Sequence, residues 1–199
     1  MRQKALLAVV ALVAVLLVAP MAFANPNLLA NGSFETSDFT GWTTGGNFVD
    51  TFVVSGSYYA YPGAEDGLFY AALGPVGADG TLSQTFATTA GAHYTFSFWF
   101  ASVGDNPSDF SVSWDANVLL SLTNPNTGVN WTEYSFTQTG TGSDSITFSF
   151  ADNPGYMALD NVSVVLNQPT TPEPSSLLLL GSGLLTVGGV IRRKLRANR

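Results

Sequence analysis

A regular alternation of apolar and polar side chains is the feature that most constrains the fold of this chain. In HYTFSFWFAS (93–102) four aromatic rings fall on one face, and Trp99 falls on the other with small or polar residues. SITFSF (145–150) repeats the pattern. A period of two is that of a β-strand with one buried face. Further strands are predicted at 29–35, 48–54, 68–73, 81–88, 109–114, 117–122, 132–138 and 159–166.

The strand pattern predicts an all-β domain over residues 25–167. Turn signals such as Asp66-Gly67 and Asp79-Gly80 separate the strands, and no segment has the pattern of a helix. Nine or ten short strands at this length favour an antiparallel β-sandwich, most simply a jelly roll. The fold class is therefore a jelly-roll sandwich, flanked by an N-terminal signal-peptide helix and a C-terminal single transmembrane helix.

Residues 1–24 have the composition of a secretory signal peptide. Arg2 and Lys4 precede an apolar run, and the segment ends in Ala-Phe-Ala. The run is about 15 residues long, which is short against the roughly 20 that span a bilayer. Cleavage after Ala24 is predicted, and an uncleaved anchor is the alternative.

Charge is divided between the body and the ends of the chain. Residues 25–171 hold thirteen of the fourteen carboxylates and none of the seven Lys and Arg residues. Such a surface repels phosphate, so nucleic acid is not an expected partner, and acidic substrates are disfavoured for the same reason. The carboxylates must be solvated, hydrogen-bonded or neutralised by a cation, for which calcium is the natural candidate. There is no cysteine, so disulfides and thiolate chemistry are excluded.

Several motifs of the body resemble those of carbohydrate-binding jelly rolls with a galactose-binding-like fold. They occur in the family's order: NLLANGSFETSDFTGW (27–42), DGLFYAALG (66–74), GTLSQTF (80–86), GAHYTFSFWFAS (91–102) and YMALDNVSVV (156–165). The resemblance implies a structural Ca²⁺ that ties the first strand to the last, with Glu35 and Asp160 as side-chain ligands and backbone carbonyls near Ser33. The alternative is that Glu35 is a surface residue and that Asp160 is bonded to backbone amides.

The usual catalytic sets are absent from the body, and the chain is predicted not to be an enzyme. His93 is the single histidine, which excludes multi-histidine metal centres, and no nucleophile elbow or phosphate loop is present. A glycoside hydrolase needs only two carboxylates, so it stays open as the least favoured alternative. Glu35, Glu65 and Glu133 are the only glutamates of the body, and nothing marks two of them as a pair.

Sugar binding is the activity that the aromatic content favours, because aromatic rings stack on the C–H faces of sugars. The alternation places Trp99 on the face opposite the apolar row, where it would line an open groove. The alternative for each residue is a place in the core or under a loop. The candidates are Trp99, Tyr58, Tyr59, Tyr61 and Trp42, with Trp131 as a further possibility.

The C-terminus combines three features. A Pro-rich linker (168–174) contains Pro172-Glu173-Pro174, and residues 175–199 form an apolar run and a basic tail. The run would reach about 25 Å as a helix, against about 30 Å for the hydrocarbon core. The basic residues place that end in the cytoplasm, with the domain on the periplasmic side.

This arrangement resembles the PEP-CTERM sorting signal of Gram-negative bacteria. The resemblance implies an exosortase as the processing partner and transient anchoring in the inner membrane. The cell surface or the extracellular matrix would be the destination, with exopolysaccharide as a candidate ligand. The alternatives are a permanent anchor, and a structural or adhesive protein without a specific glycan.

Overall fold

The computed structural model describes residues 25–167 of the 199-residue chain. The described part contains ten strands and no helix, which confirms the all-β prediction. Their bounds are β1 Thr43–Gly46, β2 Thr51–Ser55, β3 Phe69–Leu73, β4 Gly80–Ala87, β5 His93–Val103, β6 Ser108–Trp114, β7 Asn117–Thr123, β8 Asn126–Thr139, β9 Ser143–Asp152 and β10 Met157–Leu166.

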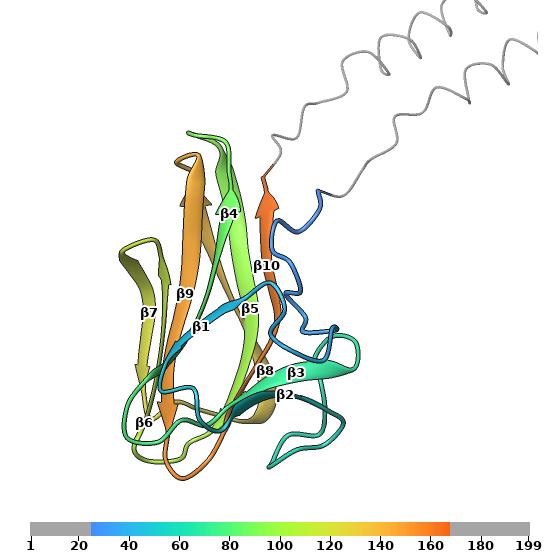
Figure 1. Ribbon diagram of the computed structural model, residues 1–199, viewed down its shortest axis with the longest axis vertical. Coiled ribbons are helices and arrows are strands. Elements are labelled where there is room, and N and C mark those ends of the chain that lie inside the picture. The colour runs from blue at the N-terminus through green and yellow to red at the C-terminus, as the bar shows by residue number, and fades with distance from the viewer. Residues whose placement is uncertain (1–24, 168–199) are drawn as a thin grey trace, which may run out of the picture. The chain divides into compact units, whose positions relative to one another are not determined.

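The strands form two five-stranded sheets (Figure 1). The first sheet has the order β1-β4-β9-β6-β7, and the second has the order β2-β3-β10-β5-β8. Every pairing in both sheets is antiparallel. Several neighbouring strands are far apart in sequence, such as β4 and β9 in the first sheet and β3 and β10 in the second. This is the predicted jelly-roll sandwich.

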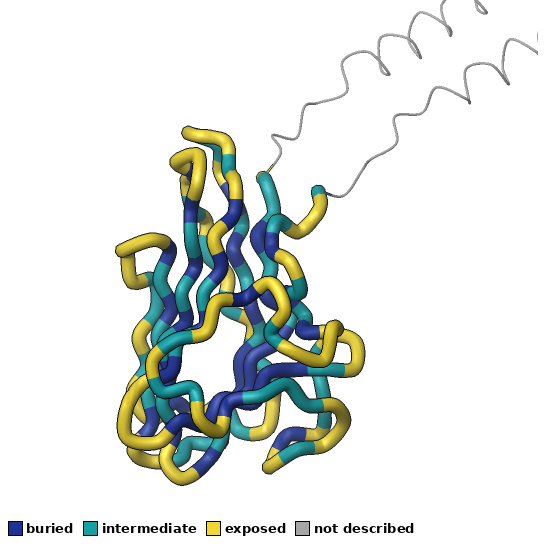
Figure 2. The backbone as a smooth tube through the Cα atoms, viewed as in Figure 1, coloured by how far each residue is buried: buried dark blue, intermediate teal, exposed yellow. Residues whose placement is uncertain are grey.

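The alternating rows fill the space between the sheets. Along β5 and β9, buried residues alternate with more exposed ones, and Figure 2 shows the exposed residues gathered mainly in the loops. Phe96 and Phe98 from β5 meet Phe148 from β9, with ring centroids 6.2 and 5.2 Å apart. The aromatic row of the sequence is therefore the centre of the core.

The opening segment does not form the strand predicted at 29–35. Asn31, Phe34 and Ser37 have positive φ angles of 52°, 56° and 63°, which breaks extended geometry and gives consecutive turns. The segment is still tied to β10, because the Leu28 amide donates to the Val164 carbonyl at 2.8 Å. The strand prediction was wrong here, and the short β1 was not predicted.

Three predictions fall on residues that the structure does not describe. They are the signal peptide with its cleavage after Ala24, the Pro172-Glu173-Pro174 linker, and the helix of 175–199. Within residues 25–167, no helix is long and apolar enough to cross a membrane.

Candidate functional site

The outer face of the second sheet is divided into two halves. In this article, the cover loop is the segment 56–68, which joins β2 to β3 and packs over one half of that face. We call this the covered half, and we call the part around Trp99 the open half. The covered half has a small hydrophobic cluster of its own, formed by Tyr61, Tyr70, Ala101 and Ala158 with Val54, Tyr58, Ala64, Val103 and Trp131 around them.

Tyr61 is the centre of the covered half. Its ring is 1% exposed, and its hydroxyl donates to the Tyr156 carbonyl at 2.6 Å. Burial raises the pKa of Tyr61 well above its ordinary value, and the charge of Asp152 adds to the shift. Trp131 packs against Tyr61 at 6.5 Å and donates from Nε1 to the Gly63 carbonyl at 3.2 Å. Tyr61 therefore has no free ring face for a sugar.

Tyr58 and Tyr59 lie at the margin of the cover loop. Tyr58 is partly buried, pairs with Tyr61 through two backbone hydrogen bonds, and contacts Phe52 and Tyr156 edge to face. Tyr59 is 50% exposed, but its hydroxyl is engaged as a donor to Asp105 Oδ2 at 2.8 Å. Both tyrosines fasten the loop to its neighbours.

Trp42 is a core residue. It is 8% exposed, it stacks on Phe34 with centroids 5.8 Å apart, and its Nε1 donates to the Asn31 carbonyl at 3.0 Å. These contacts leave no ring face available at the surface. The structure thus favours the core alternative for Trp42.

Trp99 lies on the open half, as the alternation predicted. In register it sits between Glu133 of β8 and Asp160 of β10. Its side chain is only partly buried and belongs to neither hydrophobic cluster. The residues that continue the same outer face across the three strands are small and hydroxyl-bearing: Thr95, Ser97, Ser135, Thr137 and Ser163.

The predicted calcium ligand Glu35 anchors the cover loop at its second end. Its Oε1 accepts from the amides of Leu68 and Phe69 at 2.8 and 2.9 Å. Gly67 directly precedes these two residues with φ of +69°, and a Cβ at this position would collide with the Glu35 carboxylate. A glycine is therefore required where the loop passes Glu35.

Asp160 holds the same loop from the sheet. Its Oδ2 accepts from the amides of Glu65 and Asp66 at 2.8 and 3.0 Å, and its Oδ1 accepts from the Asn161 amide at 2.7 Å. Asp160 is fully buried, and this burial raises its pKa to about 7 although the three amides act in the other direction. Asp160 thus stands between the two halves, with the cover loop on one side and Trp99 on the other.

Ser33 completes this group through its side chain, since its Oγ donates to Asp66 Oδ2 at 3.0 Å. Oxygen ligands without a basic neighbour suit Ca²⁺ in chemistry. Within residues 25–167, however, no three Asp, Glu or His side chains converge on a point that could hold a metal ion. The amides already bound to Glu35 and Asp160 match the alternative given above, and calcium at Glu35, Asp160 and Ser33 stays a prediction.

Sequence reasoning did not foresee the link between Asp160 and the cover loop. Glu65 and Asp66 are about 95 residues away, and the bonds come from their backbone amides, which carry no sequence signal. The sequence did predict a turn at Asp66-Gly67 before the next strand, and Gly67 has a positive φ there.

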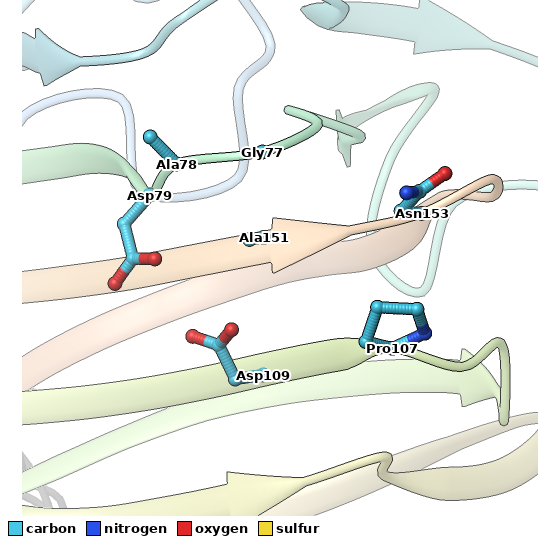
Figure 3. Close-up of a pocket in the computed structure, with 7 residues that line it drawn as sticks. All are labelled: Gly77, Ala78, Asp79, Pro107, Asp109, Ala151 and Asn153. Atoms are coloured by element: carbon cyan, nitrogen blue, oxygen red, sulfur yellow. The ribbon is translucent and has the colours of Figure 1, made fainter.

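A further cavity lies on the first sheet, near the turn before β4. It has a volume of about 200 Å³ and carries two carboxylates, Asp79 and Asp109, whose side chains point toward one another (Figure 3). Burial raises the pKa of Asp109, and the charge of Asp79 adds to this shift. Asp79 also accepts a hydrogen bond from Ser149 Oγ at 2.8 Å. The cavity is smaller than an ordinary ligand pocket.

Comparison with known protein families identifies the C-terminal segment. Residues 170–194 match the PEP-CTERM protein-sorting motif, which confirms the resemblance found in the sequence. The motif is that of an exported protein. No curated protein matches the chain.

Solved structures with the same fold have low sequence identity. TmCBM61, a carbohydrate-binding module solved in complex with β-1,4-galactotriose, is 20% identical with a TM-score of 0.58, over 71% of this chain and 99% of that one. The Stig cyclase Fisc from Fischerella sp. TAU is 17% identical with a TM-score of 0.54, over 73% and 98%. The enzymatically active domain of tailspike protein 4 from bacteriophage CBA120 is 20% identical with a TM-score of 0.52, over 71% of this chain but only 21% of that one. These similarities establish the jelly-roll fold, which serves binding modules and enzymes alike.

Proposed function

We propose that this chain, which carries a PEP-CTERM motif, is an exported surface protein whose sandwich domain binds a polysaccharide through the open half. One observation carries the proposal: Trp99 presents its ring on the outer face of a sheet, outside both hydrophobic clusters and among hydroxyl groups. A lone aromatic platform with polar neighbours provides stacking and hydrogen bonding at low entropic cost. The fold shared with TmCBM61 supports this proposal.

The charge of the domain restricts the ligand class. Residues 25–167 contain no Lys or Arg that could pair with the carboxylates or sulfates of an acidic glycan. Glu133 is exposed beside Trp99 and would repel such groups. The ligand is therefore a neutral polysaccharide, held by stacking on Trp99 and by hydrogen bonds to the serines and threonines around it.

Binding without hydrolysis is the second part of the proposal. Two of the three glutamates accept hydrogen bonds at the cover loop: Glu35 from the Leu68 amide, and Glu65 from the Asn161 side chain. Near Trp99 only Glu133 is a free acid, because Asp160 is buried and bonded to three amides. A hydrolase would need two available carboxylates on the open half.

The experiment is affinity electrophoresis of the full-length chain through gels that contain neutral polysaccharides, β-1,4-galactan among them, and acidic ones for comparison. Trp99→Ala should abolish retardation, with a loss of affinity of at least about tenfold for a lost aromatic stacking contact. Val118→Ala is the matched control, since Val118 is 67% exposed on β7 of the first sheet. Equal retardation of the wild type and Trp99→Ala would contradict the proposed face. No retardation by any polysaccharide would contradict sugar binding and would favour a structural or adhesive role.

A further inference from the structure

The inward-facing row of side chains on β9 has a carboxylate at each end, Asp144 and Asp152. These two carboxylates differ in their hydrogen-bond partners. Asp144 and Asp152 are each 1% exposed. Asp144 accepts hydrogen bonds from the hydroxyls of Thr88 and Thr141 and from the Thr141 amide. Burial acts to raise the pKa of Asp144, but these hydrogen bonds together bring it below its ordinary value. Asp144 is therefore a satisfied buried anion.

Asp152 has no such partners. Both of its carboxylate oxygens are buried, and neither has a hydrogen-bond partner among the described residues. The Gly155 amide acts in favour of the anion but does not form a hydrogen bond to either oxygen. Burial, with the charge of Asp105 as the second cause, raises the pKa of Asp152 to about 7. A buried carboxylate without hydrogen-bond partners destabilises the fold unless something neutralises its charge.

A second carboxylate, Asp105 in the loop between β5 and β6, lies near enough for its charge to act on Asp152. Its Oδ2 accepts from the Tyr59 hydroxyl at 2.8 Å, and its backbone carbonyl accepts from Ser108 Oγ at 2.6 Å. The backbone of Gly155 closes over this group, since a Cβ there would collide with Asp105 Oδ2 and would lie 2.8 Å from the Tyr59 hydroxyl. The two acids are thus enclosed by three segments: the cover loop, the β5–β6 loop and the β9–β10 turn.

Nothing in the domain can neutralise this pair, because residues 25–167 contain no Lys or Arg and their single histidine, His93, lies on β5 at the exposed end beside Thr139. The charge must be balanced from solution. The atoms available here as metal ligands are all oxygens. A hard divalent cation binds carboxylate, carbonyl and water oxygens.

We propose that Asp105 and Asp152 form a binding site for a hard divalent cation of the Ca²⁺ class, which clasps the cover loop to the two loops beneath it. This site is distinct from the group of Glu35, Asp160 and Ser33, whose carboxylates already accept backbone amides. The two acids supply up to four ligand oxygens, and backbone carbonyls and water complete the shell. Tyr59 and Tyr61 are the other titratable groups that face the pair.

The test is a Ca²⁺ titration of the metal-free full-length chain in mild detergent at pH 7.5, followed by calorimetry and by the melting temperature. Ca²⁺ should raise the melting temperature of the wild type by several degrees. Asp152→Asn should bind at least about tenfold more weakly at this site and should lose that rise, because the substitution removes one negative charge and one carboxylate oxygen from the shell, and Ca²⁺ affinity depends on the number of charged ligands. In chelator, Asp152→Asn should melt at the same temperature as the wild type or higher, since the unpaired charge is gone.

Two further variants separate this site from its alternatives. Asp105→Asn should lower the Ca²⁺ affinity as Asp152→Asn does, whereas Asp160→Asn should keep the binding event. Asp152→Asn that binds Ca²⁺ as tightly as the wild type would overturn the proposal. A wild type that shows neither Ca²⁺ heat nor a rise in melting temperature would also overturn the proposal, because a proton alone would then neutralise the pair.

Discussion

The covered and open halves lie on one face of one sheet, and they use aromatic residues in opposite ways. On the covered half, Tyr61 of the cover loop and Tyr70 of β3 are both buried, and Trp131 packs against them. On the open half, Trp99 has no aromatic neighbour within stacking distance among the described residues and stays partly exposed. The difference teaches that aromatic content alone does not mark a sugar site. What matters is whether a loop covers the ring.

The largest loss of stability is expected from a substitution in the covered half. Tyr61→Ala should destabilise the domain by about 3–5 kcal/mol, because it opens a cavity under the cover loop and removes a buried hydrogen bond. Trp99→Ala should cost less than about 1 kcal/mol, since only a partly exposed ring is lost. Urea denaturation of both variants measures the difference. Equal losses would mean that the two halves are packed alike.

The pH dependence of stability tests the burial of two carboxylates of the domain, Asp152 and Asp160. The folded pKa values of Asp152 and Asp160 are raised to about 7, so both acids bind protons more tightly when folded than when unfolded. Their protonation therefore stabilises the fold at low pH, and this contribution is lost as the pH rises from about 4 through 7.

In chelator, the free energy of unfolding should fall by about 2–4 kcal/mol between pH 5 and pH 8, with both groups contributing. Urea denaturation at several pH values measures this slope, and Asp152→Asn should flatten it. Sugar binding should not follow the same curve, because Trp99 and the serines around it do not titrate in this range. A slope of the opposite sign would contradict the buried state of these two acids.

A smaller effect is expected where the loop meets the sheet. Asp160→Ala should destabilise the domain by about 2–3 kcal/mol, because the amides of Glu65 and Asp66 lose their acceptor. Hydrogen exchange should show faster exchange over residues 56–68 and little change along β4 and β9. Exchange that accelerates uniformly would indicate that Asp160 supports the whole sandwich and not the cover loop in particular.

The smallest effect concerns the margin of the cover loop. Tyr59→Phe removes the hydroxyl that donates to Asp105 but keeps the ring, so it should cost about 0.5–1 kcal/mol. The midpoint of thermal unfolding measures it, and Tyr58→Phe serves as the matched control. A change larger than that of Asp160→Ala would mean that the Tyr59 hydroxyl does more than hold Asp105.

The sequence predicted the strands where alternation is strong and failed where the backbone is irregular. β5 and β9 were visible because their apolar rows repeat every second residue, and the same period placed Trp99 outward. The segment 29–35 is apolar enough to resemble a strand, but positive φ angles at Asn31 and Phe34 turn it into loops. β1, with the sequence TTGG, has no apolar row at all.

The candidate site was predictable only in part, for a related reason. Tyr61, Trp42 and Tyr59 differ in burial because of tertiary contacts made by loops, and composition does not show these contacts. Asp152 did carry a signal: the alternation of 145–150, continued by two residues, places this acid on the inward face. What the alternation could not show is that Asp152 lacks the threonine partners that Asp144 has at the other end of β9.

One measurement tests the proposed function most directly: the indole N–H signals of the four tryptophans, followed by NMR while a binding polysaccharide fragment is added. The indole groups of Trp42 and Trp131 are bonded to backbone carbonyls, and Trp114 is 3% exposed in the core. The Trp99 signal should therefore shift with saturation while the other three stay in place. A shift of the Trp131 signal alone, with Trp99 unchanged, would place the ligand at the cover loop and contradict the account.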